Sequence, residues 1–495
     1  MMKVSTRRKY LLSVEGAWAM RRLQIGSRLG SFAFAVFVLS ACVDLAPTYH
    51  RPPMPTPAIV PPDATRTSDQ SPVGWRAFFA DPKLRSVIAQ ALTNNRDLRI
   101  AVANVAAARA QYHVQRAAEL PTVTANVGAT YGQTPSTVAA GGSVAGNSGP
   151  YNERLYNVTA GVSAWQLDLF GKVRNLTQAA QQQYFASREA RDAAQVTLVS
   201  EVAADWLTLG ADRGLLAIAE DTLKSGKDSL DLIQRRFAAG VDSQLEVSQA
   251  ETIVQQARYD VAHLNTQVAR DRDALDLVVG APVAEDLLPA GVVERTAVLE
   301  SLPEAVSSGV LLARPDVLQA EDQLRAANAN IGAARAAFFP NIALTGSGGL
   351  TSLALSTLFT GAAGTWTFAP AVSQTLFDNG ANRGNLAYAK AQRDIGLAGY
   401  EKAIQTAFRE VADALAQRRT IDEQLAAQQA LVDAASRSLD LATARFDRGS
   451  DTYLNVLIAR RTLYAAQQTL VAARLARTAN LVTLYASLGG GLDAN

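Results

Sequence analysis

The chain has 495 residues, of which 48% are hydrophobic and 19% are charged, a balance typical of folded proteins and not of disordered ones. Its formal net charge is +2, but without residues 1–41 it keeps 40 Lys and Arg against 44 Asp and Glu. This excludes a basic nucleic-acid-binding surface, and a single cysteine excludes a disulfide framework.

The N-terminal segment has the pattern of a processing signal. A basic stretch from Met20 to Arg28 precedes the apolar Ser31–Leu39, which is too short to span a bilayer as a mature helix. Leu39–Cys42 then looks like a bacterial lipobox, in which the cysteine is lipidated; the alternative is an ordinary signal peptide with a chance cysteine. We predict a lipoprotein signal peptide over 1–41, over-extended before Met20, and lipid attachment at Cys42.

Residues 42–74 are expected to form an extended tether, because Pro47–Pro62 is rich in proline. Val43, and not Asp, follows the cysteine, which resembles lipoproteins sorted to the outer membrane.

A first structural unit is predicted over residues 75–280. It opens with two helices separated by a break at Asn95–Leu98, and the second helix ends before Pro121. The period then changes from helical to two. One face of each predicted strand is apolar and the other small and polar, which fits membrane strands; the alternative is a half-buried soluble sheet. The apolar positions are Val123, Ala125, Val127, Ala129 and Tyr131, then, after a flexible loop over Gly132–Arg154, Tyr156, Val158, Ala160 and Val162.

A helix of great length follows, from Lys172 to Phe237, which corresponds to about 100 Å at 1.5 Å per residue. Apolar residues recur every seven positions before the turn at Gly240 and again after it, so two helices joined by a short turn should make an antiparallel coiled-coil hairpin. Gly240 is expected to end the first helix and Asp242 to cap the second. By itself, this hairpin also fits a simple stalk. The seven-residue positions are Leu216, Leu223, Leu230, Phe237, Val247, Val254, Val261, Val268 and Leu275.

The same pattern is written a second time after a linker over 281–313, which contains three prolines and one expected short helix. The second unit covers 314–491, followed by a tail over 492–495. Arg236-Phe237 recurs as Arg445-Phe446, 209 residues later, and Gly240 recurs as Gly449. Gapless repetition of this length indicates a duplicated unit. The second strand pair is expected around Ile342, Leu344, Trp366, Phe368, Pro370 and Val372, joined by a loop over Gly348–Gly364, with a bulge or irregular spot at Pro370.

Each unit therefore reads helix, strand, strand, long helix, turn, helix. Four strands cannot close a membrane sheet, because every edge must be paired and about eight strands is the practical minimum. Three copies would supply twelve strands. The predicted fold class is mainly α with membrane β: two tandem repeats that assemble as a trimeric 12-stranded β-barrel continued by a coiled-coil α-helical tunnel.

Several motifs together resemble the TolC-like outer-membrane efflux factors, in the lipoprotein branch related to nodulation-type transport proteins. They are Leu39–Cys42, Phe79-Ala80-Asp81-Pro82, Trp165–Gly171, Arg314–Asp316, Leu376–Gly380, Phe408–Leu415, Gly449–Leu454 and Leu488–Gly491. The resemblance implies a homotrimer in the outer membrane that extends into the periplasm and forms the exit channel of a tripartite efflux system for drugs and toxic compounds. It implies two partners, a periplasmic adaptor and an inner-membrane pump of the RND type.

The resemblance also assigns roles to the hairpin tips. The adaptor would dock on Gly240, Val241, Asp242, Gly449, Ser450 and Asp451. The periplasmic constriction would be formed by Leu454 and Ile458, with Leu245 and Gln249 at the matching positions of the first unit. Many relatives carry Asp where this chain has Ile458, so the gate here is expected to be hydrophobic. The alternative for both leucines is packing within the helix pair.

The alternative functions are a type I protein-secretion channel and a structural coiled-coil lipoprotein. The alternating strands favour a channel, because a stalk does not require them. An enzyme is not expected, and neither is a cofactor or a metal, because His50, His113 and His263 are scattered without metal-ligand spacing and without a nucleophile or phosphate-loop motif.

Overall fold

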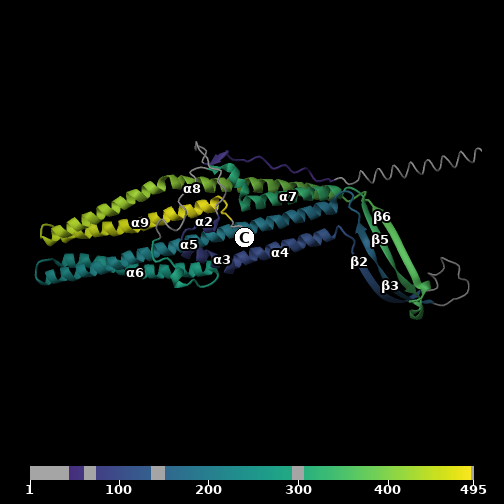
Figure 1. Cartoon of the computed structure of the whole chain (residues 1–495), viewed down its shortest axis with the longest axis horizontal. Helices are drawn as coiled ribbons and strands as arrows, with labels where there is room; N and C mark the ends of the chain where they lie inside the picture. The colour runs from purple at the N-terminus through teal and green to yellow at the C-terminus, as the bar shows by residue number, and fades with distance from the viewer. Residues whose placement is uncertain (1–43, 61–73, 135–150, 293–305, 492–495) are drawn as a thin grey trace, which may run out of the picture. The chain divides into compact units, whose positions relative to one another are not determined.

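The computed structural model describes residues 44–60, 74–134, 151–292 and 306–491 (Figure 1). Cys42, the rest of the predicted signal peptide and parts of the predicted tether, linker and first strand loop lie outside the described residues. The chain divides into two compact units, of which one comprises residues 1–50, 109–182 and 325–395 and the other residues 51–108, 183–324 and 396–495. Both repeats contribute to each unit.

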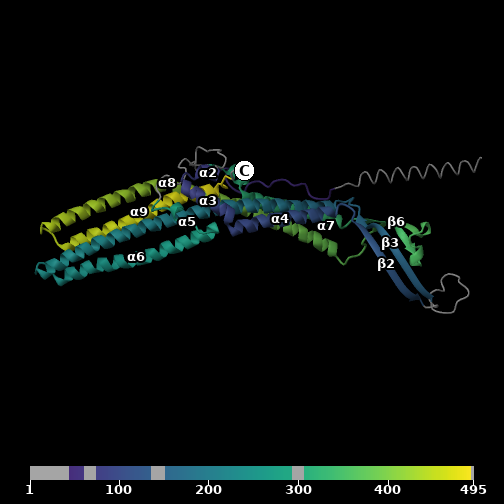
Figure 2. The ribbon, with the colours of Figure 1, turned by 60° about the horizontal axis from the view of Figure 1, so that its bottom comes forward.

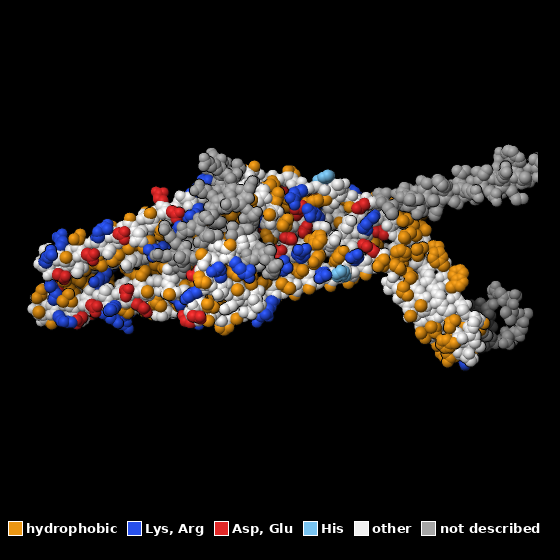
Figure 3. Space-filling model, in the orientation of Figure 1, with side chains coloured by type: hydrophobic (Ala, Val, Ile, Leu, Met, Phe, Trp, Pro, Cys, Tyr) orange, Lys and Arg blue, Asp and Glu red, His pale blue; other side chains and the backbone are white. Residues whose placement is uncertain are grey.

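The first compact unit contains a four-stranded antiparallel sheet. Its strands are β2 (Val123–Thr134), β3 (Tyr151–Gln166), β5 (Asn341–Ser352) and β6 (Gly364–Ser373), in the spatial order β2-β3-β5-β6. The four predicted strands are confirmed, with shorter loops than expected. Two short 3-10 helices, Leu355–Thr357 and Gly361–Ala363, lie in the second loop. Figure 3 shows apolar and uncharged side chains over the strands, whereas charged side chains gather over the helices.

The irregular point of this sheet is in β3 and not at Pro370, so that prediction was wrong. The β5–β6 register runs unshifted from Asn341–Ser373 to Leu350–Gly364 and includes the pair Leu344–Pro370. Proline is tolerated there because β6 is an edge strand of the sheet. The shift lies between Val162 and Trp165 in the β3–β5 pairing, where Ala164 has φ +51°.

The helices follow the predicted order. They are α2 (Trp75–Phe78), α3 (Pro82–Asn94), α4 (Arg96–Ala117), α5 (Lys172–Ala238), α6 (Gln244–Val279), α7 (Pro315–Ala336), α8 (Ala381–Asp447) and α9 (Tyr453–Ser487). α5 and α8 each have 67 residues, which confirms the predicted long helices. Figures 1 and 2 show the hairpin α5–α6 beside the hairpin α8–α9. None of the helices in the described part of the chain combines the length and the apolarity that crossing a membrane requires.

The main core of the second compact unit forms where α2 and α3 pack against α5, α6 and α9. Phe78 stacks on Tyr485 with ring centroids 4.5 Å apart, and the indole Nε1 of buried Trp206 donates to Leu287 O at 3.0 Å. Gly210 was expected to mark a change in winding, but α5 is continuous through it. A Cβ at this position would lie 2.7 Å from Gly291 O, so the glycine makes room for the inter-repeat linker.

The linker holds more structure than the one short helix expected for it. It contains the 3-10 helices Glu285–Leu287 and Ser308–Ala313 and the strand β4 (Val306–Ser307), which pairs with β1 (Ile59–Val60). The second sheet therefore joins the linker to the segment that follows the predicted lipid anchor.

That N-terminal segment is extended, as expected, but it lies against the helices and is not a free tether. Arg335 Nη1 on α7 donates to Leu45 O at 2.9 Å, and Asn328 Nδ2 donates to Pro47 O at 2.7 Å. Nearer the start of α7, Arg51 makes a bidentate ion pair with Glu321, whose side chain is 2% exposed. We call residues 44–60 the N-terminal strap.

Candidate functional site: the hairpin tips

Each long hairpin turns at a glycine in the left-handed conformation, Gly240 with φ +72° and Gly449 with φ +71°. The residue after each glycine donates its N–H five residues back: Val241 N to Arg236 O at 2.9 Å, and Ser450 N to Arg445 O at 2.9 Å. This is the Schellman arrangement, which satisfies carbonyl groups that the end of a helix leaves free. The predicted glycine stops are confirmed at both tips.

The predicted capping role of Asp242 was wrong. Ser243 is the N-cap of α6 and forms a capping box with Glu246, whose carboxylate accepts from Ser243 N at 2.7 Å. Asp242 instead accepts from Arg236 Nε and Nη2 at 2.8 and 3.0 Å, and its side chain is only 4% exposed. The hydrogen bond to this carboxylate raises the pKa of Arg236 above its ordinary value, so the pair stays ionised.

The second tip repeats this pair in a more exposed form. Arg445 Nε lies 3.3 Å from Asp451 Oδ2, and the two side chains are 64% and 16% exposed. Asp451 is not the N-cap residue of α9, because that position is Thr452. Its carboxylate accepts from Thr452 N at 2.8 Å and from Asn455 Nδ2 at 2.6 Å, and these bonds hold the pKa of Asp451 below its usual range.

The two tips are tied together by apolar packing. The Arg236 guanidinium lies over the Phe446 ring, 4.7 Å from its centroid, so the ion pair of the first tip rests on the second hairpin. Beneath it is a cluster that we call the tip core, formed by Ile233, Val247, Ala250, Phe446, Tyr453, Val456 and Leu457. The tip core comes from α5, α6, α8 and α9, so the hairpins move as one body at this end.

The four residues predicted to form the constriction lie outside the tip core. Leu454 and Ile458 are one turn apart on α9 and are 47% and 54% exposed, whereas Val456 and Leu457 beside them are buried. At the matching positions of α6, Leu245 is 66% exposed and Gln249 is half-buried. Within one chain, therefore, Leu454 and Ile458 do not pack the helix pair, and they form an aliphatic face available to something outside it.

Sequence reasoning missed a polar contact between the hairpins that lies further from the tips. The Tyr464 hydroxyl donates to Asp260 Oδ2 at 2.9 Å. Arg460, one turn earlier on α9, donates from Nη1 to Ser229 Oγ at 2.8 Å and to Ser225 O at 3.0 Å. These residues border a cavity of about 500 Å³ between α5, α6 and α9. Arg460 and Tyr464 share a helix face, but this spacing alone does not identify partners about 200 residues away.

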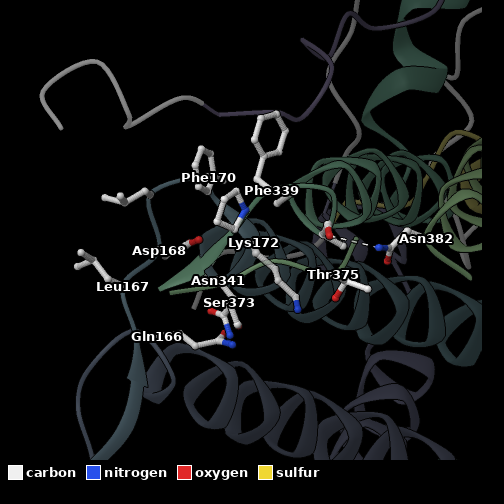
Figure 4. Close-up of a pocket in the computed structure, with 14 residues that line it drawn as sticks. Gln166, Leu167, Asp168, Phe170, Lys172, Phe339, Asn341, Ser373, Thr375 and Asn382 are labelled. Carbon is white, nitrogen blue, oxygen red and sulfur yellow. Dashed lines mark hydrogen bonds between the residues drawn. The ribbon is translucent and has the colours of Figure 1, made fainter. Parts of the chain in front are cut away.

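A second cavity, of about 290 Å³, lies where the strands meet the helices (Figure 4). Its lining comes from the end of β3, the starts of β5, α5 and α8, and the segment after β6. Asp168 accepts from Arg174 N at 2.8 Å, and Asn382 Nδ2 donates to Ala337 O at 3.4 Å, the bond drawn in Figure 4. These contacts begin the helices and hold the strand ends, so we assign the cavity a structural role.

A duplicated chain with alternating strands and paired long hairpins defines the class of outer-membrane channel proteins. The family model described as "Outer membrane efflux protein" matches residues 87–281 and 306–490. The chain belongs to this family. It is therefore an outer-membrane efflux channel protein and not an enzyme.

Similar proteins cover nearly the whole chain. The probable efflux pump outer membrane protein TtgC of Pseudomonas putida is 42% identical over 467 residues, covering 93% of this chain and 95% of that protein. The probable outer membrane lipoprotein SilC of Salmonella typhimurium is 37% identical, covering 92% and 97%.

Solved structures give the same result. A membrane protein from Pseudomonas aeruginosa is similar with a TM-score of 0.84 at 38% identity, covering 91% of this chain and 98% of that one. The open state of the Neisseria gonorrhoeae MtrE outer membrane channel gives a TM-score of 0.81 at 36% identity, covering 91% and 99%.

Proposed function

We propose that three copies of this chain form a closed 12-stranded β-barrel in the outer membrane, continued by a tunnel of the long helices. The observation that carries this proposal is the sheet order β2-β3-β5-β6, which leaves β2 and β6 as edges. Val127 is 81% exposed and Trp366 80% exposed on these edge strands. An apolar sheet with open edges is unstable in lipid, and closure by further copies pairs the edges.

The exposed aliphatic face of the tips supports a hydrophobic gate. Three-fold symmetry would repeat Leu454 and Ile458 round one axis, with Leu245 and Gln249 from the first repeat near them. An ion crossing such a ring must shed water without gaining a polar partner, so the ring blocks ions at rest. The support is that these side chains are exposed while their neighbours fill the tip core.

The tips themselves offer backbone and charged groups to a partner. Gly240, Val241 and Asp242 in the first tip, and Gly449, Ser450 and Asp451 in the second, would dock a periplasmic adaptor. The adaptor would join the channel to an inner-membrane pump of the RND type, and lipidation of Cys42 would anchor the chain.

The transported molecules would be small amphipathic compounds such as solvents and drugs. Among the similar proteins, one from Pseudomonas putida is named a toluene efflux pump outer membrane protein and another an antibiotic efflux pump outer membrane protein, each 42% identical.

The test deletes the gene in its own host and measures susceptibility to toluene and to a panel of antibiotics. Wild-type complementation should restore resistance, and purified protein in detergent should have the mass of three protomers. Unchanged susceptibility would refute the substrate class, and a monodisperse monomer that keeps its strand content would refute barrel closure. Mass spectrometry should find acyl chains on Cys42.

A further inference from the structure

The sheet contains a joint between the two repeats that can serve as a template for the joint between copies. β3 is the second strand of the first repeat and β5 is the first strand of the second, and they pair antiparallel. The free edges are β6, the second strand of the second repeat, and β2, the first strand of the first repeat. A β6–β2 pairing between copies would therefore be the repeat-related equivalent of β3–β5.

The structure fixes which residues are equivalent. Pro121 and Pro340 precede β2 and β5, which sets an offset of 219 residues between these strands. Val123 pairs with Val162 in one hairpin and Ile342, at 123 + 219, pairs with Val372 in the other, so β3 and β6 differ by 210.

Two matching side-chain bonds support this assignment beyond the strands. Trp165 Nε1 donates to Glu119 O at 3.3 Å, and Gln374 Nε2 donates to Phe338 O at 3.1 Å. Gln374 is 209 residues after Trp165, one fewer than in the strands, because β3 contains one extra residue at its bulge.

We propose that β6 of one copy pairs antiparallel with β2 of the next copy in the register Val372–Val127 and Phe368–Tyr131. The pairs Val162–Gly346 and Val158–Leu350 within the chain become these two pairs when the offsets are applied. The inference rests on the proposed trimer and adds the residues that meet.

The faces of the strands agree with this register, although they were not used to derive it. Directly opposite residues of an antiparallel pair point to the same side of a sheet. Val127, Tyr131, Phe368 and Val372 are each 64–81% exposed in the single chain, and all are apolar or aromatic. A slip of one residue would place Val372 opposite Asn126 or Gly128 and turn one apolar face against a polar one.

A contact at the base of the strands repeats the relationship. Within the chain, Phe170 of the Leu-Phe motif stacks on Phe339, with centroids 4.7 Å apart. The corresponding motif residue of the second repeat, Phe377, is 85% exposed, and Leu120, which corresponds to Phe339, is 70% exposed. In the proposed register, Phe377 lies near Leu120 of the next copy and covers it.

Paired cysteines test the register in the full-length chain, which has one cysteine of its own. The test variant carries Val127→Cys and Val372→Cys. β2 and β6 of one chain are three strands apart, about 14 Å, which is too far for a disulfide. A bond can therefore form only between copies. The matched control carries Val123→Cys and Val372→Cys, because Val123 is on the same face but four residues, or about 13 Å, along β2.

After mild oxidation, the test variant should run as a covalent trimer in denaturing gels, with loss of most monomer, and the control should remain monomeric. Both should be trimers in detergent before oxidation. A detergent-stable trimer that fails to cross-link at 127–372, or that cross-links at 123–372, overturns the register and leaves the proposed trimer standing. A monomer in detergent overturns both.

Discussion

The phenol oxygen of Tyr464 on α9 lies 2.9 Å from Oδ2 of Asp260 on α6, to which its hydroxyl donates. Burial and the acceptor carboxylate raise the pKa of Tyr464 above its usual value, so the hydroxyl stays protonated and remains a donor. Because α6 belongs to the first hairpin and α9 to the second, this bond holds the hairpins together below the tip core. Hairpins that separate to open a gate must break it.

Tyr464→Phe is therefore expected to loosen the closed arrangement. Loss of one hydrogen bond to a charged acceptor costs about 1.5–3 kcal/mol, and single-channel recording should show a higher resting conductance. Tyr259→Phe is the control, because Tyr259 is 65% exposed on the same helix. Equal conductance of the two variants would show that the bond does not restrain opening.

The gate residues give a second prediction. Leu454→Ser should raise the resting current, since a hydroxyl lets water enter the ring, and Ile458→Asp should introduce cation selectivity. Planar-bilayer recordings of the purified protein measure both effects. Leu277→Ser is the matched control, because Leu277 is 79% exposed near the far end of α6. Wild-type conductance of Leu454→Ser would exclude this leucine from the seal.

Stability should depend on pH through a carboxyl pair between α5 and α6. Burial raises the pKa of Asp212 to about 7, and hydrogen bonding to Asp271 and the charge of Asp271 add to the rise. The folded protein thus binds this proton more tightly than the unfolded chain. The stabilisation is fully present below the unfolded pKa of about 4 and is lost as the pH rises through about 7.

The melting temperature in detergent should therefore fall between pH 5 and pH 8. Asp212→Asn keeps a donor toward Asp271 at every pH, so its melting temperature should depend less on pH and exceed that of the wild type at pH 8. Asp286→Asn, a change of a carboxyl in the linker, is the control and should keep the wild-type slope. A wild-type slope in Asp212→Asn would remove the pair from the explanation.

Periodicity predicted most of the fold because it records local geometry. Alternation at period two marked four strands and the seven-residue repeat marked both hairpins. One break in the repeat also has a structural reason. Arg477 occupies an apolar heptad position, and its guanidinium donates to Asp422 on α8 at 2.7 Å, so a buried ion pair replaces an apolar contact.

Contacts between distant segments left no periodic signal. The strap was expected to be a free tether because proline composition predicts extension and does not show what lies beside it. The pairing of β1 with β4 joins residues almost 250 positions apart, and neither short segment shows a strand pattern. Asp242 was assigned to the cap by residue type, although Ser243 beside it is equally suited and leaves Asp242 for Arg236.

The last prediction concerns the strap. Arg51 Nε and Nη2 donate to Glu321 Oε1 and Oε2 at 3.0 and 2.7 Å, and the Glu321 side chain is 2% exposed while that of Arg51 is 44% exposed. Arg51→Ala would remove the bidentate partner of a carboxylate that water hardly reaches. The free energy of unfolding should fall by about 3 kcal/mol, and the strap should become accessible to protease.

Two further variants separate the ion pair from a general effect of losing an arginine. The double variant Arg51→Met and Glu321→Leu removes both charges and should recover much of the lost stability, because the buried carboxylate is gone. Arg393→Ala breaks an exposed pair with Asp394, which should change stability by less than about 1 kcal/mol. Urea unfolding and limited proteolysis measure the outcome. If Arg51→Ala unfolds like Arg393→Ala, the ion pair does not hold the strap on α7.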